Sequence, residues 1–135
     1  MSGLVVDASI VVAWLFDDED EPRADRVLEQ LAEDGALVPQ LWHLETRNAL
    51  LTAERRRRLS PEEVRERLDA LKGLPIATDG EPDLQSAFDL ARAHGLSLYD
   101  ALYLELAKRK RAELATLDGS LGRAAIAEGM SVSAT

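Results

Sequence analysis

The sequence predicts an α/β fold: a parallel sheet with helices on both faces. Short, β-branched apolar runs alternate with longer segments of helical periodicity along the whole chain. Helix start and stop signals separate these segments at regular intervals. The chain has 135 residues, enough for one domain with a buried core. No internal repeat or low-complexity linker divides it, so residues 1–135 are expected to form a single domain.

The first half contains three predicted strands and four predicted helices. Pro22 suits the first turn of a helix, and Ser60 followed by Pro61 forms a strong N-cap signal. Gly35 and Gly73 stand where helices are expected to end. The acidic run Asp17–Glu21 is predicted to be a solvated loop that ends the first helix. Strands are expected at 4–6, 36–38 and 75–77, and helices at 10–16, 22–33, 41–57 and 61–72.

The second half is organised around a buried helix and the strand that follows it. Ser97 is a suitable N-cap for a helix over 98–109, which would rise roughly 18 Å at about 1.5 Å per residue. A strand over 112–117 would return roughly 20 Å. If the two run antiparallel, Asp100 and Asp118 reach the same edge of the fold. The other expected elements are helices at about 82–94 and 121–129 and a possible edge strand over 130–134.

Composition limits the function classes. The net charge of −9 argues against broad, non-specific binding to nucleic acid, but carboxylates that bind divalent cations leave a nucleic-acid enzyme possible. The chain contains no cysteine, which excludes disulfides, thiolate metal sites and a cysteine nucleophile. It shows no membrane-spanning run and no signal peptide pattern, so a cytoplasmic location is expected.

Four acidic residues are expected to converge at the carboxyl edge of the sheet, where parallel α/β domains place their sites. Asp7 ends the first strand, Asp118 follows a later strand, Asp100 begins a helix at that edge, and Glu45 lies about one turn into the long helix. Oxygen ligands without cysteine or a well-placed histidine favour Mg²⁺ or Mn²⁺ over zinc. Such a centre suits hydrolysis of a phosphodiester bond.

Each acid also has a purely structural interpretation. Asp7 and Asp118 suit helix N-caps, Asp100 suits a capping box, and Glu45 suits the positive end of a helix dipole. Arg55–Arg58 could contact RNA backbone, but a solvated helix end is the favoured interpretation, as it is for the other basic run, Lys108–Arg111. Neither histidine has partner ligands at metal spacing. The tryptophans and tyrosines are expected in the core or in a dimer contact: Trp14, Trp42, Tyr99 and Tyr103.

Four short motifs occur in a definite order over the whole chain. They are VVDAS at 5–9, P-x-L-x-x-x-E-x-x-N-A-L at 39–50, GLSLYDALYLELA at 95–107 and TLDGSL at 116–121. In this combination the sequence resembles the PIN-domain family, specifically the VapC toxins of bacterial and archaeal toxin–antitoxin pairs.

The resemblance implies a fold, an activity and a set of site residues. The fold would be a five-stranded parallel sheet in the order 3-2-1-4-5. The activity would be that of an Mg²⁺- or Mn²⁺-dependent endoribonuclease, inhibited by a cognate VapB-like antitoxin and commonly homodimeric. The family's acidic quartet corresponds to Asp7, Glu45, Asp100 and Asp118, its small hydroxyl to Ser9, and its polar helix residue to Asn48.

The resulting hypothesis assigns metal binding to Asp7, Asp100 and Asp118. Glu45 would orient or deprotonate the attacking water or ligate a second ion, while Ser9 and Asn48 would position a carboxylate or phosphate. One alternative is a PIN-like subunit that binds an antitoxin in a repressor complex without cleaving RNA. Another, a receiver or aspartate-nucleophile phosphatase, is disfavoured because VDASIV lacks the second aspartate of D-x-D and no lysine follows a late strand.

Overall fold

Five parallel strands form one sheet in the order β3-β2-β1-β4-β5, so the predicted fold class and strand order are confirmed. The computed structural model describes residues 3–16 and 21–133, so most of the acidic run expected to end the first helix lies outside the described residues. The strands are β1 (Leu4–Val6), β2 (Ala36–Pro39), β3 (Ile76–Asp79), β4 (Glu113–Ala115) and β5 (Val132–Ser133).

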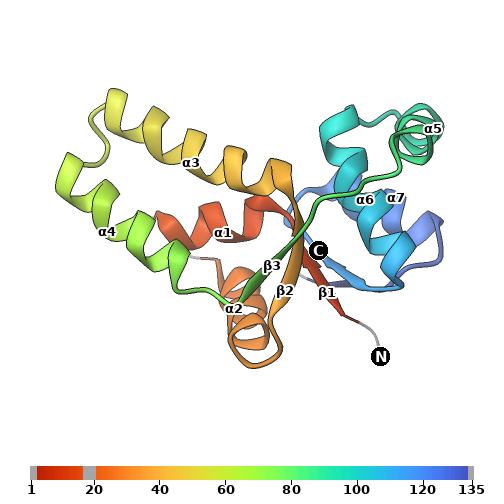
Figure 1. Ribbon diagram of the computed structural model, residues 1–135, viewed down its shortest axis with the longest axis horizontal. Helices are drawn as coiled ribbons and strands as arrows, with labels where there is room; N and C mark the ends of the chain where they lie inside the picture. Colours follow the sequence, from red (N-terminus) through yellow and green to blue (C-terminus); the bar gives the residue numbers. More distant parts are fainter. Residues whose placement is uncertain (1–2, 17–20, 134–135) are drawn as a thin grey trace.

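Helices cover both faces of the sheet. The helices are α1 (Ala8–Leu15), α2 (Pro22–Asp34), α3 (Gln40–Arg55), α4 (Pro61–Lys72), α5 (Leu84–His94), α6 (Leu98–Lys110) and α7 (Gly119–Ala127). Figure 1 shows α1 to α4 on one side and α5 to α7 on the other. No helix within the described ranges is long and apolar enough to cross a membrane.

The core lies around the central strands and α6. Val5 and Leu114, which are register partners on β1 and β4, are both fully buried. Helix α6 is apolar on several sides, as its sequence predicts, and six of its residues are buried. Burial of a large apolar side chain contributes about 1.5–3 kcal/mol, so this layer holds the site-bearing ends of β1, β4 and α6 in fixed relation.

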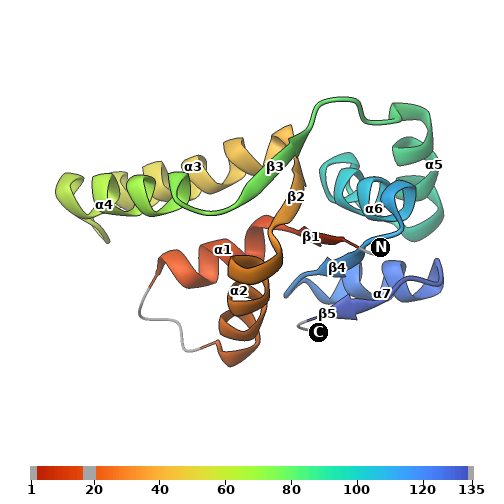
Figure 2. The same ribbon diagram turned by 60° about the horizontal axis from the view of Figure 1, so that its bottom comes forward.

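Helices α3 and α4 form a hairpin that extends beyond the sheet (Figures 1 and 2). The buried stripe of α3 consists of Trp42, Thr46, Leu50 and Ala53. Leu44, although it has helical spacing in the sequence, is 62% exposed. At the turn, Ser60 and Glu63 form the complete capping box that fixes the start of α4. The far end of the hairpin therefore has a capped helix start, and its other end joins the sheet through β2 and β3.

Several helices begin at different residues from those predicted because aspartates cap them. Asp7 accepts a hydrogen bond from the Ser9 N–H, so α1 starts at Ala8 rather than Ile10. Asp118 accepts from Ser120 and Leu121, so α7 starts at Gly119. Asp83 likewise starts α5 at Leu84. An aspartate side chain satisfies the exposed N–H groups of the first turn and thereby sets its position.

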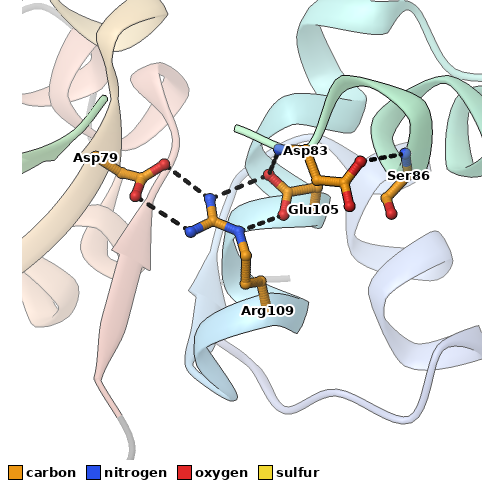
Figure 3. A network of polar contacts seen from close by, with 5 residues as sticks. All are labelled: Asp79, Asp83, Ser86, Glu105 and Arg109. Carbon is orange, nitrogen blue, oxygen red and sulfur yellow. Dashed lines mark hydrogen bonds and ion pairs between the residues drawn. The ribbon is translucent and has the colours of Figure 1, made fainter. Parts of the chain in front are cut away.

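An ion network joins α6 to the edge strand and to the segment before α5 (Figure 3). The Arg109 guanidinium donates to both carboxylate oxygens of Asp79, at 3.2 and 2.7 Å. It also donates to both oxygens of Glu105, at 2.6 and 3.2 Å, and Glu105 is only 3% exposed. The Asp83 N–H donates to Glu105 as well. Arg109 stays exposed, as the predicted solvated helix end implies, and its guanidinium also forms ion pairs with Asp79 and Glu105.

Candidate active site

The candidate site lies where the chain leaves β1 and β4, next to each other at the centre of the sheet. Asp7 follows β1 directly, and its N–H donates a hydrogen bond of 3.0 Å to the Ala115 carbonyl at the end of β4. Asp118 follows β4 and caps α7. Because β1 is flanked by β2 on one side and β4 on the other, this edge is the topological switch point of the sheet.

Asp7 is the centre of a buried hydrogen-bond network, with 5% of its surface exposed. Its Oδ1 accepts from the Ser9 N–H at 2.7 Å and from the Ser9 hydroxyl. Its Oδ2 accepts from the Thr116 hydroxyl. The Leu117 N–H donates to Ser9 Oγ, and the Asp118 N–H donates to Thr116 Oγ1, each at 2.9 Å. The two connections that follow β1 and β4 are therefore locked to one carboxylate.

Burial raises the pKa of Asp7 above its ordinary value. The hydrogen bonds from Ser9 and Thr116 oppose this shift because they stabilise the charged form, and the nearby Asp100 charge adds to it. Hydrogen bonds from Ser9 and Thr116 thus hold the Asp7 carboxylate in place, but the raised pKa means that its ionised form is less favourable here than in water.

Asp100 and Asp118 meet at the same edge, as the antiparallel arrangement of helix and strand predicts. Asp100 lies in the first turn of α6, where its N–H donates to the Ser97 hydroxyl at 3.1 Å. Burial raises the pKa of Asp100, and the charge of Asp118 raises it further. Asp118 itself is exposed, and its Oδ1 accepts from the Ser120 and Leu121 N–H groups.

Glu45 reaches the same region from α3. Its Oε1 accepts a hydrogen bond of 2.6 Å from the hydroxyl of Tyr103, which lies on α6 and is 1% exposed. Burial raises the pKa of Tyr103 strongly, and the Glu45 and Asp7 carboxylates raise it further. The carboxylates of Asp7 and Glu45 thus both act on the Tyr103 phenol. The charge of Asp100 acts in turn on Asp7, and that of Asp118 acts on Asp100, so each of the four predicted acids lies near another member of this group.

The chemistry of these groups fits a hard divalent cation. All the donors are oxygens, and the mutual repulsion of Asp7, Asp100 and Asp118 is the kind that a bound cation relieves. Within residues 3–16 and 21–133, however, no three Asp, Glu or His side chains are arranged as ligands of one ion. Mg²⁺ commonly keeps several waters and uses only one or two carboxylates, so the donor set fits such an ion without a closed protein cage.

Comparison with known proteins identifies the family. A family model described as the PIN domain matches residues 4–127. The chain belongs to the PIN-domain family. It is 36% identical to Ribonuclease VapC3 of Pyrobaculum aerophilum over 122 residues, which are 87% of this chain and 91% of that protein.

Solved structures share the PIN fold at lower sequence identity. PAE2754 from Pyrobaculum aerophilum matches with a TM-score of 0.67 and 21% identity, over 97% of this chain and 89% of that one. FitAcB from Neisseria gonorrhoeae matches with a TM-score of 0.69 and 16% identity, over 96% and 95%. A toxin–antitoxin complex from Klebsiella pneumoniae matches with a TM-score of 0.59 and 19% identity, over 87% of each chain.

The other residues that the sequence singles out are exposed or have hydrogen-bond or packing partners of their own. Asn48 is exposed and lines a hollow of about 520 Å³ between α3 and α4; among the described residues, no hydrogen bond joins it to the four acids. The Arg58 guanidinium packs 5.0 Å from the Phe16 ring centroid. His43 pairs with Thr78, and His94 pairs with Glu128, so neither histidine faces the acids.

The sequence patterns do not identify two residues of the site. Thr116 belongs to the TLDGSL motif, which gives its hydroxyl no role; its position two residues before Asp118, after a buried strand, is the signal that points to one. For Tyr103 the sequence predicts the core or a dimer contact. The core assignment is confirmed, and the spacing of three residues from Asp100 places Tyr103 on the same face of α6.

Proposed function

We propose that this PIN domain is a metal-dependent endoribonuclease toxin of the VapC type, which hydrolyses phosphodiester bonds in RNA. The observation that carries the proposal is the convergence of acids from four separate parts of the chain at the switch point of the sheet. Asp7 and Asp100 have raised pKa values there, since Asp7 is buried, Asp100 is half-buried, and each lies near another carboxylate. The 36% identity to a protein named Ribonuclease VapC3 supports RNA as the substrate.

The proposed roles follow from position and burial. Asp7, Asp100 and Asp118 would hold Mg²⁺ or Mn²⁺, together with water. Ser9 and Thr116 keep Asp7 oriented through their hydrogen bonds. Asn48, on the exposed face of α3, would contact a phosphate of the substrate.

The bound cation would lower the pKa of a water ligand and stabilise negative charge on the phosphate. Glu45 would accept a proton from the attacking water or orient it, or would ligate a second ion. Held at one oxygen by Tyr103, the Glu45 carboxylate keeps its second oxygen for that task. Asp118, the most exposed of the three aspartates at the edge of the sheet, lies where a phosphate in solution can approach.

Partners and location belong to the same proposal. A VapB-like antitoxin would bind the toxin and block cleavage, in line with a structural neighbour solved as a toxin–antitoxin complex. Two copies of the toxin would form a homodimer in the cytoplasm. Exposed apolar side chains on α5 and on the start of α6 supply surface for such an assembly: Leu84, Phe88 and Leu98.

The test is cleavage of a mixed RNA pool by purified, antitoxin-free protein in Mg²⁺, Mn²⁺ or EDTA, beside Asp100→Asn. The proposal expects cleavage that needs the metal and is lost in the variant. The matched control is Asp69→Asn, which changes an exposed aspartate of α4 and should cut normally. Equal cutting by wild type and Asp100→Asn would overturn the proposal. Folded protein that binds an antitoxin but cuts no RNA would favour the non-catalytic binding subunit.

A further inference from the structure

We propose that Tyr103 is a positioning residue that holds the Glu45 carboxylate at the acidic centre and thereby sets the rate of cleavage. The inference deepens the proposed function and rests on it. The hydrogen bond that carries it joins residues 58 positions apart in the sequence, on two helices that belong to opposite sides of the sheet (Figure 1).

The position of Tyr103 suits this role. It lies one turn after Asp100 on α6, and side chains three residues apart on a helix share a face. The ring is buried in the core and cannot swing away, so its hydroxyl is presented from a rigid base. The 2.6 Å bond to Glu45 Oε1 is the length expected for a hydroxyl that donates to a carboxylate.

The hydrogen bond runs from the Tyr103 hydroxyl to the Glu45 carboxylate. The phenol supplies the proton of the bond, and an ionised carboxylate offers acceptor oxygens only. Tyr103 therefore acts on Glu45 as a donor that orients the carboxylate.

Glu45 needs an anchor because of where it stands. It is in the first half of α3, the helix that pairs with α4 in Figure 2. Its long side chain has several rotatable bonds. In the described part of the chain, Tyr103 is the hydrogen-bond partner of the Glu45 carboxylate. Without that donor, the carboxylate could take several rotamers, few of which would face Asp7 and Asp100.

A plain packing role for Tyr103 makes a different prediction. A buried tyrosine generally finds some partner for its hydroxyl, and the bond alone could serve only stability. In that case Tyr103→Phe, which keeps the ring and removes the hydroxyl, would lower stability and leave turnover of the folded protein unchanged. A positioning role requires a fall in kcat that depends on the presence of Glu45.

The experiment is a double-mutant cycle of Tyr103→Phe and Glu45→Gln, with Tyr99→Phe as the matched control. Tyr99 is on the same helix and is 62% exposed. Steady-state RNA cleavage is measured over a range of RNA concentrations at saturating metal, which gives kcat and KM for every variant. Urea unfolding of the same proteins in EDTA gives their free energies of unfolding, from which the contribution of the Tyr103–Glu45 hydrogen bond is obtained without metal or substrate.

The inference expects Tyr103→Phe to lower kcat by about 10- to 100-fold, as loss of an orienting hydrogen bond in a metal site does, with KM for RNA unchanged. In the Glu45→Gln background the same change should have no further effect on kcat and a smaller effect on unfolding. Tyr99→Phe should match the wild type.

Two results would overturn the inference while leaving the proposed function standing. One is a kcat for Tyr103→Phe equal to that of Tyr99→Phe. The other is an equal loss of kcat in the presence and absence of Glu45, which would mean that Tyr103 acts elsewhere. If the wild type itself shows no metal-dependent cleavage, the proposed function fails, and this inference fails with it.

Discussion

The Thr116 hydroxyl donates a hydrogen bond to Asp7 Oδ2 and accepts one of 2.9 Å from the Asp118 N–H. The fully buried side chain of Thr116, which is 109 positions from Asp7 in the sequence, thus connects the acid that follows β1 to the acid that caps α7. The relative placement of these two acids depends on the hydroxyl rather than on the sheet alone.

Thr116→Val should therefore damage both stability and cleavage. Valine has nearly the same shape but no hydroxyl, so it leaves a buried carboxylate oxygen and the Asp118 N–H without their partner. Such a loss costs about 1–3 kcal/mol of unfolding free energy, measurable by urea denaturation. Thr116→Ser, which keeps the hydroxyl, should retain the cleavage rate that Thr116→Val loses. Equal cleavage by the two variants would show that the hydroxyl does not organise the site.

The metal-free protein should become more stable when Asp100 is neutralised. In the folded state the pKa of Asp100 is raised above its ordinary 3.8, so ionisation of this group opposes folding at neutral pH. The direction of the shift means that burial and the Asp118 charge outweigh the favourable field of the α6 N-terminus. Asp100→Asn in EDTA should raise the midpoint of thermal unfolding at pH 7.

The pH dependence supplies the control for this prediction. The gain from Asp100→Asn should shrink as pH falls through the raised pKa of Asp100, because the wild-type carboxyl is then protonated and uncharged as well. A gain that grows towards acid pH would contradict the assignment of a raised pKa.

Divalent cations should stabilise the wild type more than the variant. A ligand that binds only the folded state adds about 2.7 kcal/mol at a concentration one hundred times its dissociation constant. Thermal unfolding in increasing Mn²⁺ should show this rise for the wild type and a much smaller rise for Asp100→Asn. An identical response of both proteins would place the ion away from Asp100.

The Arg109 network should matter for stability and not for cleavage chemistry. Glu105 is buried, and Arg109→Ala would leave its carboxylate facing the Asp79 charge without a cation. Loss of one partner from such a pair costs about 3 kcal/mol or more, which urea unfolding can measure. At a temperature where the variant is folded, its cleavage rate should equal that of the wild type. A lower rate would mean that this network influences the acidic centre.

Much of this architecture follows from patterns that are local in sequence. Alternating apolar runs and capping signals predict the elements, and the lengths of α6 and the following strand bring Asp100 and Asp118 to one edge, as the structure confirms. The family resemblance gives the strand order because the motif order identifies a known topology. The starts of α1, α5 and α7 differ from the predicted starts by two residues each, since a capping aspartate decides the first turn.

The remaining features are contacts between distant residues that no periodicity encodes. The bond between Tyr103 and Glu45 depends on the angle at which α6 meets α3, and the Thr116–Asp7 bond depends on the register of β1 and β4. The burial of Glu105 beside Arg109 cannot be predicted from the sequence either. A Glu–Arg pair four residues apart on a helix has the same sequence pattern whether the glutamate is exposed or buried.

The most direct test of the acidic centre is the anomalous scattering of Mn²⁺ in crystals of the wild type and of Asp100→Asn. We expect a manganese peak bounded by the carboxylates of Asp7, Asp100 and Asp118 in the wild type, and its loss or marked weakening in the variant. A peak elsewhere, or one of equal strength in both crystals, would contradict the claim that these acids form the metal centre of the nuclease.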